Sequence, residues 1–166
     1  MYVKQPILKY RLKKLRGNPT KVKCAQDVMK YVDDLFNLGT ERLVALYLDS
    51  LNIVVAYKII TEGTVNQMKP FIREIMRYAI NLDACSIIVC HNHPTGNPMA
   101  SEDDKKWTET LCVAANSHGI TINDHIIVGR QYNNERIYFA FSEECQQILK
   151  SNLLSEQGKG GVENGK

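Results

Sequence analysis

An uninterrupted apolar run, CSIIVC at residues 85–90, is the feature that most limits the folds open to this chain. A strand with one face in solvent alternates apolar and polar residues, whereas a short run without alternation is typical of a strand covered on both faces. A loop rich in proline, glycine and asparagine, HNHPTGNPMA, follows directly at residues 91–100. We therefore predict a central strand of a sheet that carries helices.

The segments around this strand alternate between helical and strand periodicity. Their order, α-β-β-α-β-α-β-β-α, predicts an α/β fold with one mixed sheet flanked by helices. The expected helices are 25–38, 69–82, 101–118 and 142–154, the last one capped by Ser142, and the expected strands are 42–49, 53–61, 85–90, 120–128 and 136–141.

Length and charge divide the chain into three parts. Its 166 residues suit a single domain, which we place at residues 24–154. Residues 1–23 form a basic arm with eight Lys or Arg and no acid, while the rest holds the other 13 basic and all 18 acidic residues, a net charge of −5. The arm is either a solvated leader or a contact for nucleic acid or an acidic partner. Residues 155–166 are polar and glycine-rich, which predicts a disordered tail.

Three observations predict a cytoplasmic protein. No apolar run approaches the ~20 residues of a membrane span, and the basic N-terminal residues lack the apolar core of a secretory signal. The five cysteines form no CxxC pair, which suits reduced thiols in the cytoplasm. We expect no membrane contact, and the oligomeric state is not predicted.

The residues most suited to chemistry are His91, His93, Ser101 and Asp104. Positions two apart in an extended segment point to the same side, so both imidazoles can face one point at the end of the central strand. Ser101 and Asp104 fall three apart at the start of the next helix. Two imidazoles and a carboxylate are the ligand set of a catalytic zinc, with the fourth position left for water. Taken singly, these residues could be surface histidines and a helix cap, but together they predict a zinc site.

The neighbouring candidates have simpler interpretations. Cys90 should point away from His91, into the packing on the other face. His118 lies near a helix end, where the helix dipole favours it. Asp124 and His125 lie in a predicted strand, where they form either a satisfied pair in the core or a pair that supports a metal ligand. The core interpretation is the one that we prefer from the sequence.

The segment HNHPTGNPMASEDD resembles the signature of the JAMM metalloproteases, the JAB/MPN domain, which reads HxH, seven residues, then SxxD. It is most similar to the RadC-like proteins, which read HNHPSG here. The similarity extends over about residues 25–142, through KPFIREIMRYAI and NDHIIVG. The resemblance implies a JAB/MPN fold, of cytidine-deaminase-like architecture, and a zinc-dependent hydrolase that cleaves peptide or isopeptide bonds in a protein substrate.

The resemblance also assigns roles to two further residues. A glutamate at the junction of the first helix and first strand acts as general base in the family, and Glu41 holds that position here. Chemistry alone would leave Glu62 and Glu74 as competitors. Ser101 is implied to stabilise an oxyanion. Many RadC-like proteins carry a helix-hairpin-helix DNA-binding module before this domain, where this sequence has the basic arm.

Alternative functions remain open from the sequence. One is a DNA-associated protein or a metal-dependent nuclease, although the contiguous letters HNH do not match the nuclease motif of that name, which is spread over a hairpin and a helix. Another is a non-catalytic interaction module, as in JAB/MPN domains that lack the metal motif. A zinc deaminase is excluded because the sequence has no PCxxC.

Overall fold

The computed structural model describes residues 21–62 and 69–150. The predicted arm up to residue 20, the predicted tail at 155–166 and the last residues of the expected final helix lie outside the described residues. Among the described residues, no helix has both the length and the apolar character that crossing a bilayer requires.

The five described strands form one mixed sheet in the order β2-β1-β3-β4-β5, in which only β3 and β4 run parallel. This confirms the predicted α/β class and the predicted order of the main elements. The elements are α1 (Ala25–Met29), the 3-10 helix η1 (Asp33–Asn37), β1 (Arg42–Leu48), β2 (Val54–Glu62), α2 (Lys69–Asn81), β3 (Ser86–Asn92), α3 (Glu102–Asn116), β4 (Thr121–Arg130), β5 (Arg136–Ala140), α4 (Phe141–Glu144) and α5 (Gln146–Lys150).

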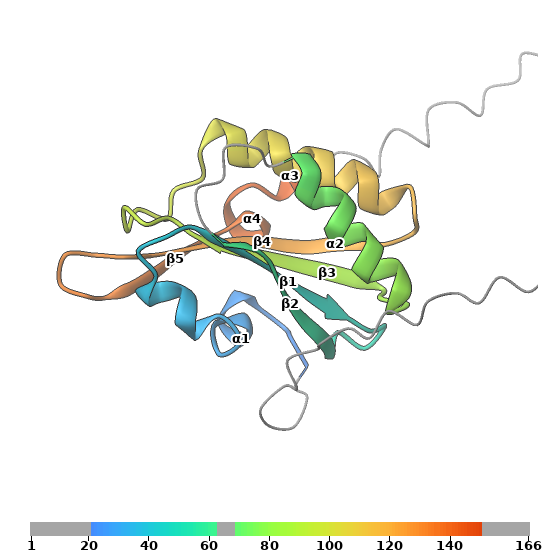
Figure 1. Cartoon of the computed structure of the whole chain (residues 1–166), viewed down its shortest axis with the longest axis horizontal. Helices are drawn as coiled ribbons and strands as arrows, with labels where there is room; N and C mark the ends of the chain where they lie inside the picture. Colours follow the sequence, from blue (N-terminus) through green and yellow to red (C-terminus); the bar gives the residue numbers. More distant parts are fainter. Residues whose placement is uncertain (1–20, 63–68, 151–166) are drawn as a thin grey trace, which may run out of the picture.

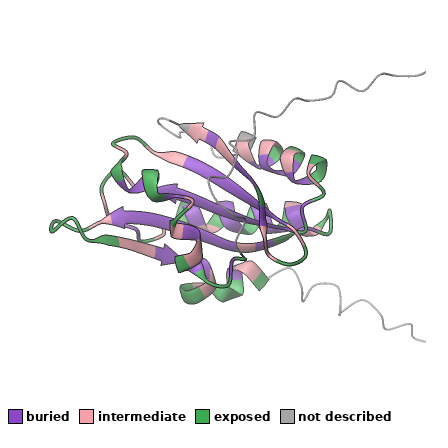
Figure 2. Ribbon diagram, turned by 90° about the horizontal axis from the view of Figure 1, so that it is seen from below, coloured by how far each residue is buried: buried purple, intermediate pink, exposed green. Residues whose placement is uncertain are grey.

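The sheet lies between two helical layers, with α2 and α3 on one face and α1 on the other (Figure 1). Alternation along each strand sorts its side chains between the two layers. In β3, Ile87 and Val89 pack with α2 and α3, whereas Ile88 and Cys90 pack with α1 and η1. All seven residues of β3 are buried, and the central strands are buried along most of their length in Figure 2. The predicted central strand is therefore confirmed, and Cys90 faces away from the α2–α3 layer as expected.

The predicted helix at 25–38 is interrupted. Residues 25–29 form a short α-helix, and the chain then turns into the 3-10 helix η1. The interruption falls where Val32 precedes Asp33 and Asp34, residues with weak helix propensity. Asp34 instead forms an ion pair with Arg42 of β1 at 2.9 Å, which ties η1 to the sheet.

The predicted cap at Ser142 is wrong. The final helical segment begins at Phe141 with Ala140 as its N-cap, and it is divided into α4 and α5. The Ser142 hydroxyl donates instead to the Asp124 carboxylate at 2.6 Å, because the chain passes β4 at this point. The five cysteines are free, and Cys85 is exposed rather than buried within its apolar run.

Strand β4 contains a register shift against β3. Ile87 pairs with Ile122, but Ile88 pairs with Asp124, so Asn123 is an extra residue in the ladder. Paired residues in parallel strands point to the same face. The shift therefore places His125, opposite Val89, on the face of α2 and α3. Without it, Asp124 would occupy that position.

Candidate metal centre

The two histidines of the HNH segment meet at the end of β3. His91 continues the alternation of Ile87 and Val89, so its side chain lies on the face of α3. His93 lies just beyond the strand, where its backbone N–H donates to Val128 of β4 at 3.2 Å. The Nε2 atoms of the two imidazoles are 3.0 Å apart, so the period-two spacing brings both rings to one point as predicted.

Asp104 reaches the same point from the first turn of α3. Ser101 caps the helix: its hydroxyl accepts from the Asp104 backbone N–H at 3.1 Å, and its own backbone N–H donates to Asp104 Oδ2 at 2.8 Å. This capping box fixes the Asp104 side chain, and it leaves Oδ1 3.4 Å from His91 Nε2. The helix-cap interpretation of Ser101 and Asp104 is therefore correct and is compatible with a metal site.

The geometry of the three side chains suits a metal ion. Their potential ligand atoms all lie within 4.8 Å of one another. His93 Nε2 lies 3.5 Å from Asp104 Oδ2. Ligand atoms at ~2.0–2.1 Å from a tetrahedral zinc are about 3.3 Å apart, close to these separations. The group His91, His93 and Asp104 could thus bind a metal ion.

Hydrogen bonding at His93 determines which of its nitrogens is free. Its Nδ1 lies 2.8 Å from the Asn97 carbonyl oxygen, which can only accept, so Nδ1 carries the proton. In the neutral ring, Nε2 therefore presents a lone pair to His91 and Asp104. A hydrogen bond with the Asp104 carboxylate raises the pKa of His93. Either a proton or a metal ion bound at His93 Nε2 would interact favourably with the Asp104 carboxylate.

Burial sets the charge of His91, and hydrogen bonds set the charge of Asp104. Burial lowers the pKa of His91 to about 4, so this imidazole is neutral at physiological pH. Burial alone would raise the pKa of Asp104, but hydrogen bonds with His93 and Ser101 hold it below its ordinary value. A buried carboxylate beside a neutral imidazole favours a cation between them.

Glu41 lies immediately before β1, beside this group. Burial raises the pKa of Glu41, the charge of His93 opposes the shift, and the charge of Asp104 adds to it, so all three residues share one electrostatic environment. Glu74 instead forms an ion pair with Arg77 on its own helix, at 3.7 Å. Glu62 pairs with Arg42 in the sheet register, and its side chain lies outside the described part of the structure. The pKa of Glu41, the predicted base, thus responds to the charges of both His93 and Asp104.

Asn92, between the two histidines, holds the backbone around Glu41. Its side chain points away from the imidazoles, because alternate residues of β3 face opposite layers. The Asn92 side-chain oxygen Oδ1 accepts from the Arg42 backbone N–H at 2.8 Å, and its side-chain nitrogen Nδ2 donates to the Thr40 backbone carbonyl at 3.0 Å. The residues on both sides of Glu41 are thus tied to the histidine segment, a role that the spacing of HNH did not predict.

The loop after His93 packs closely on β4. Gly96 has a φ of +83° and donates to the His93 carbonyl at 2.9 Å, which closes a tight turn. A Cβ at Gly129 would lie 2.1 Å from the Gly96 carbonyl oxygen. This close approach requires glycine at 129 and holds the loop that carries Asn97, the partner of His93.

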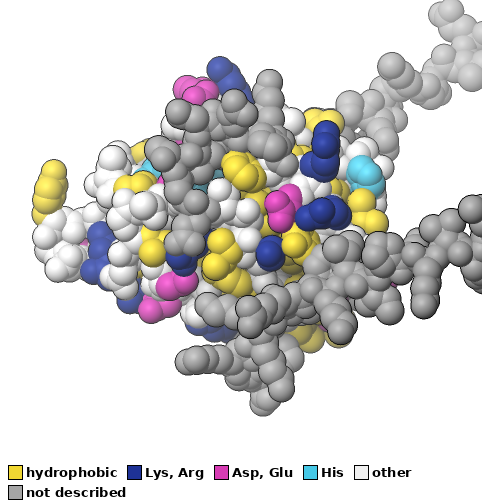
Figure 3. Space-filling view, in the orientation of Figure 1, with side chains coloured by type: hydrophobic (Ala, Val, Ile, Leu, Met, Phe, Trp, Pro, Cys, Tyr) yellow, Lys and Arg dark blue, Asp and Glu magenta, His cyan; other side chains and the backbone are white. Residues whose placement is uncertain are grey.

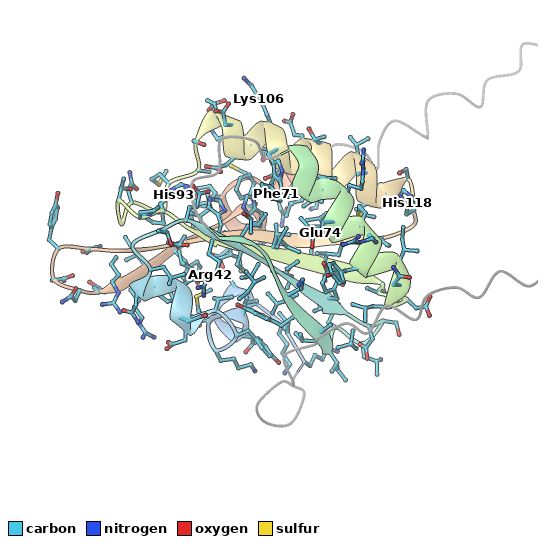
Figure 4. All side chains as sticks on the ribbon, in the orientation of Figure 1. Arg42, Phe71, Glu74, His93, Lys106 and His118 are labelled. Carbon is cyan, nitrogen blue, oxygen red and sulfur yellow. The ribbon has the colours of Figure 1, made fainter. Side chains whose placement is uncertain are left out.

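His125 is fully buried, as the core interpretation expected, and it also contacts the candidate centre. Its Nε2 lies 2.9 Å from His91 Nδ1, and burial lowers its pKa well below the ordinary value. His118 hydrogen-bonds the Ala114 carbonyl at 2.8 Å at the other end of α3, far from His93 in Figure 4. Histidine surface is accordingly visible at two separate places in Figure 3.

Solvent reaches the centre on the side of His93. The His93 side chain is 20% exposed, against 1% for His91 and 3% for Asp104. His93 also lines a cavity of about 280 Å³. The cavity is bounded by the loop after η1, the start of the His93 loop and the end of β4, and its wall includes Gly39 and Arg130. Of the three candidate ligands, His93 is the one that lines this cavity.

A mixed sheet between helices, with a His-His-Asp group where the central strand ends, defines a class of α/β domains with a candidate metal site. Within that class, a family model described as the RadC-like JAB domain matches residues 22–147. The chain belongs to this family.

Several curated relatives are similar over most of this chain. It is 37% identical to a UPF0758 protein of Streptococcus suis over 129 residues, which cover 76% of this chain and 50% of the relative. It is 33% identical to a UPF0758 protein of Aquifex aeolicus over 134 residues, covering 80% and 56%. A UPF0758 protein of Streptococcus agalactiae is 39% identical over 116 residues, covering 70% and 49%. The chain thus spans about half the length of these relatives.

Proposed function

We propose that this domain is a zinc-dependent hydrolase that cleaves a peptide or isopeptide bond. The observation that carries the proposal is the convergence of His91, His93 and Asp104, whose ligand atoms lie within 4.8 Å of one another. Membership of the RadC-like JAB domain family is compatible with such an activity. A zinc ion held by these residues would polarise a substrate carbonyl and lower the pKa of water to about 7.

In this proposal Glu41 is the general base. Burial raises its pKa toward neutrality, which improves a carboxylate as a proton acceptor at physiological pH. The base takes the proton of the attacking water and later delivers it to the leaving amine. Asn92 holds the backbone on both sides of Glu41, which limits the positions that this carboxylate can reach.

Ser101 is proposed to stabilise the oxyanion. Its hydroxyl donates to Asp104 Oδ2 at 2.6 Å, so its proton is engaged with the carboxylate. An oxyanion role requires the hydroxyl to rotate from Asp104 to the substrate oxygen. The Ser101 backbone N–H continues to hold Oδ2 during this exchange, so Asp104 keeps its orientation.

The exposed side of His93 is the proposed route for the scissile bond. Because His91 and Asp104 are buried, a substrate carbonyl reaches the centre past His93, beside the cavity bounded by Gly39 and Arg130. The identity of the protein substrate is not part of the proposal.

The test compares Glu41→Gln with Asp104→Asn. The first keeps the shape of the side chain but cannot accept a proton, so zinc content should stay at the wild-type value while hydrolysis falls by ~10²–10⁴-fold. The second weakens a ligand, so it should lose zinc together with activity. Zinc is measured by elemental analysis, and hydrolysis is measured on a substrate selected with the wild-type protein from a fluorogenic peptide and isopeptide library.

Glu74→Gln is the matched control, because Glu74 pairs with Arg77 on α2. It should keep both zinc and activity. Loss of zinc in Glu41→Gln would make Glu41 a ligand rather than a base. Cleavage of phosphodiester substrates without cleavage of any amide would show that the proposed bond is wrong.

A further inference from the structure

A third histidine, His125, is buried directly behind His91. His125 is fully buried in β4, and its Nε2 lies 2.9 Å from His91 Nδ1, the nitrogen that faces away from His93 and Asp104. The register shift at Asn123 brings His125 to this face of the sheet. Extra residues in strands often redirect a side chain beside a functional site.

The hydrogen bonds that lead from His125 have only one consistent direction. The Thr108 hydroxyl lies 2.6 Å from the Asp104 backbone carbonyl, which can only accept, so the single hydroxyl proton points there. Thr108 is also 2.6 Å from His125 Nδ1, and it must therefore accept from that nitrogen. With the proton on Nδ1, the Nε2 of neutral His125 is an acceptor, and His91 Nδ1–H donates to it.

This direction determines the tautomer of His91. A neutral imidazole with its proton on Nδ1 has its lone pair on Nε2. The Nε2 of His91 is the atom that faces His93 and Asp104. The hydrogen-bonded network runs from His91 through His125 and Thr108. Asp104 of α3 lies at both of its ends: its carboxylate is beside His91 Nε2, and its backbone carbonyl accepts from the Thr108 hydroxyl.

The surroundings of His125 hold its ring in place. Phe141 is stacked on it, with ring centroids 4.8 Å apart and an interplanar angle of 13°, and Trp107 contacts it edge-on at 5.4 Å. The Asp124 carboxylate accepts from the His125 backbone N–H at 2.8 Å and from the Ser142 N–H at 3.0 Å, which fixes β4 to α4. A ring held in this way cannot turn its acceptor away from His91.

We infer that His125 is a positioning residue that, together with Thr108, holds His91 in the tautomer whose Nε2 binds the metal. The inference rests on the proposed metal site, but it concerns residues that are not ligands. Any aromatic ring at position 125 could pack against Phe141 and Trp107. Only a side chain with an acceptor at the position of Nε2 selects the tautomer of His91. Hydrogen-bonded partners of metal-ligating histidines typically change metal affinity by 10–100-fold.

Two pairs of variants separate positioning from packing. His125→Phe keeps a ring against Phe141 but removes the acceptor, and we expect its zinc affinity to fall by ~10–100-fold in competition with a chelator. His125→Gln restores an acceptor near the position of Nε2, and it should recover most of the affinity. Thr108→Val removes the hydroxyl at constant shape and should weaken zinc binding, whereas Thr108→Ser should match the wild type.

A second measurement reads the tautomer without any metal. Nitrogen NMR of His91 in the zinc-free protein should find the proton on Nδ1 in the wild type and a shift toward Nε2 protonation in Thr108→Val. Unchanged zinc affinity in both His125→Phe and Thr108→Val would overturn the inference, as would a wild-type His91 protonated on Nε2. If His125→Phe does not fold, the comparison of Thr108→Val with Thr108→Ser tests the inference instead. Failure of the wild type to bind zinc would count against the proposed function, while the tautomer measurement would still test the network.

Discussion

At the scale of single residues, the three proposed ligands differ in how strongly a proton competes with a metal. His91 is buried and neutral, because burial lowers its pKa to about 4. His93 is partly exposed, and its hydrogen bond with Asp104 raises its pKa. Asp104 stays ionised, since hydrogen bonds with His93 and Ser101 lower its pKa. Of the three candidate ligands, His93 is therefore the one at which a proton competes with a metal up to the highest pH.

This difference predicts the pH dependence of zinc affinity. A group with a raised pKa stays protonated up to a higher pH, so affinity should fall as pH drops through the raised pKa of His93 and should level off above it. Between pH 5 and that pKa, the logarithm of the affinity should change by about one per pH unit, because only one proton is displaced. Calorimetric titrations between pH 5 and 8 measure this slope. A slope near two would show that His91 also titrates in this range.

The sequence predicted the three candidate ligands, whose side chains meet in the structure, but it left the role of His125 open. The period of two at His91 and His93, with Asp104 in a capped helix turn, requires only local geometry that holds in any extended segment and any helix start. The position of His125 depends on one extra residue in β4, at Asn123. Regular alternation would have placed His125 on the opposite face, so the sequence alone could not decide between a core pair and a pair that supports a metal ligand.

At the scale of elements, the site depends on a close contact between the His93 loop and β4. The Arg130 N–H donates to the Gly96 carbonyl at 2.9 Å, and the His93 N–H donates to Val128, so the loop is attached on both sides of Gly129. The backbone of the loop, rather than a flexible side chain, fills the space beside Gly129. This contact holds His93 in place relative to His91.

Gly129→Ala should therefore disturb the loop. Its Cβ would meet the Gly96 carbonyl oxygen at 2.1 Å, and backbone atoms can give way only if the loop moves. We expect a loss of about 1–3 kcal/mol in the free energy of unfolding and weaker zinc binding. Gly39→Ala is the control, because no atom lies within 4 Å of its Cβ, and it should stay within about 0.5 kcal/mol of wild type. Urea denaturation and chelator competition provide the two readouts, and equal behaviour of the two variants would refute the role of this contact.

Sequence patterns predicted the long elements better than the short ones. Helix α3 and the hairpin of β1 and β2 follow sustained periodicity and were located to within a few residues. The segments at 25–38 and after 140 are interrupted, because contacts with the sheet replace helical continuity there. The ion pair of Asp34 with Arg42 and the hydrogen bond of Ser142 with Asp124 are such contacts, between residues far apart in sequence.

At the scale of the whole molecule, charge is unevenly distributed along the sequence. Residues 1–20 contain six of the 21 basic residues and no acid, so the remainder has 15 basic and 18 acidic residues, a net charge of −3. A chain with this distribution should contact nucleic acid, if it does so at all, through its first residues.

Deletion of residues 1–20 tests this expectation. We expect any binding of the full chain to DNA or RNA at low salt to weaken steeply with salt and to disappear in the deletion variant. Zinc content should be unchanged, because the candidate ligands belong to β3, its following loop and α3. Fluorescence anisotropy with labelled DNA and RNA at several salt concentrations measures both effects. Binding retained by the deletion variant would place the contact on the folded domain.

The most direct measurement of the central claim is the zinc content of the wild type and of the double variant His91→Ala, His93→Ala. After zinc loading and dialysis, elemental analysis should find about one zinc per wild-type chain and none in the double variant. His118→Ala, at the far end of α3, should match the wild type, and circular dichroism should show that all three proteins are folded. A double variant that keeps its zinc, or a wild-type chain that binds none, would contradict the account.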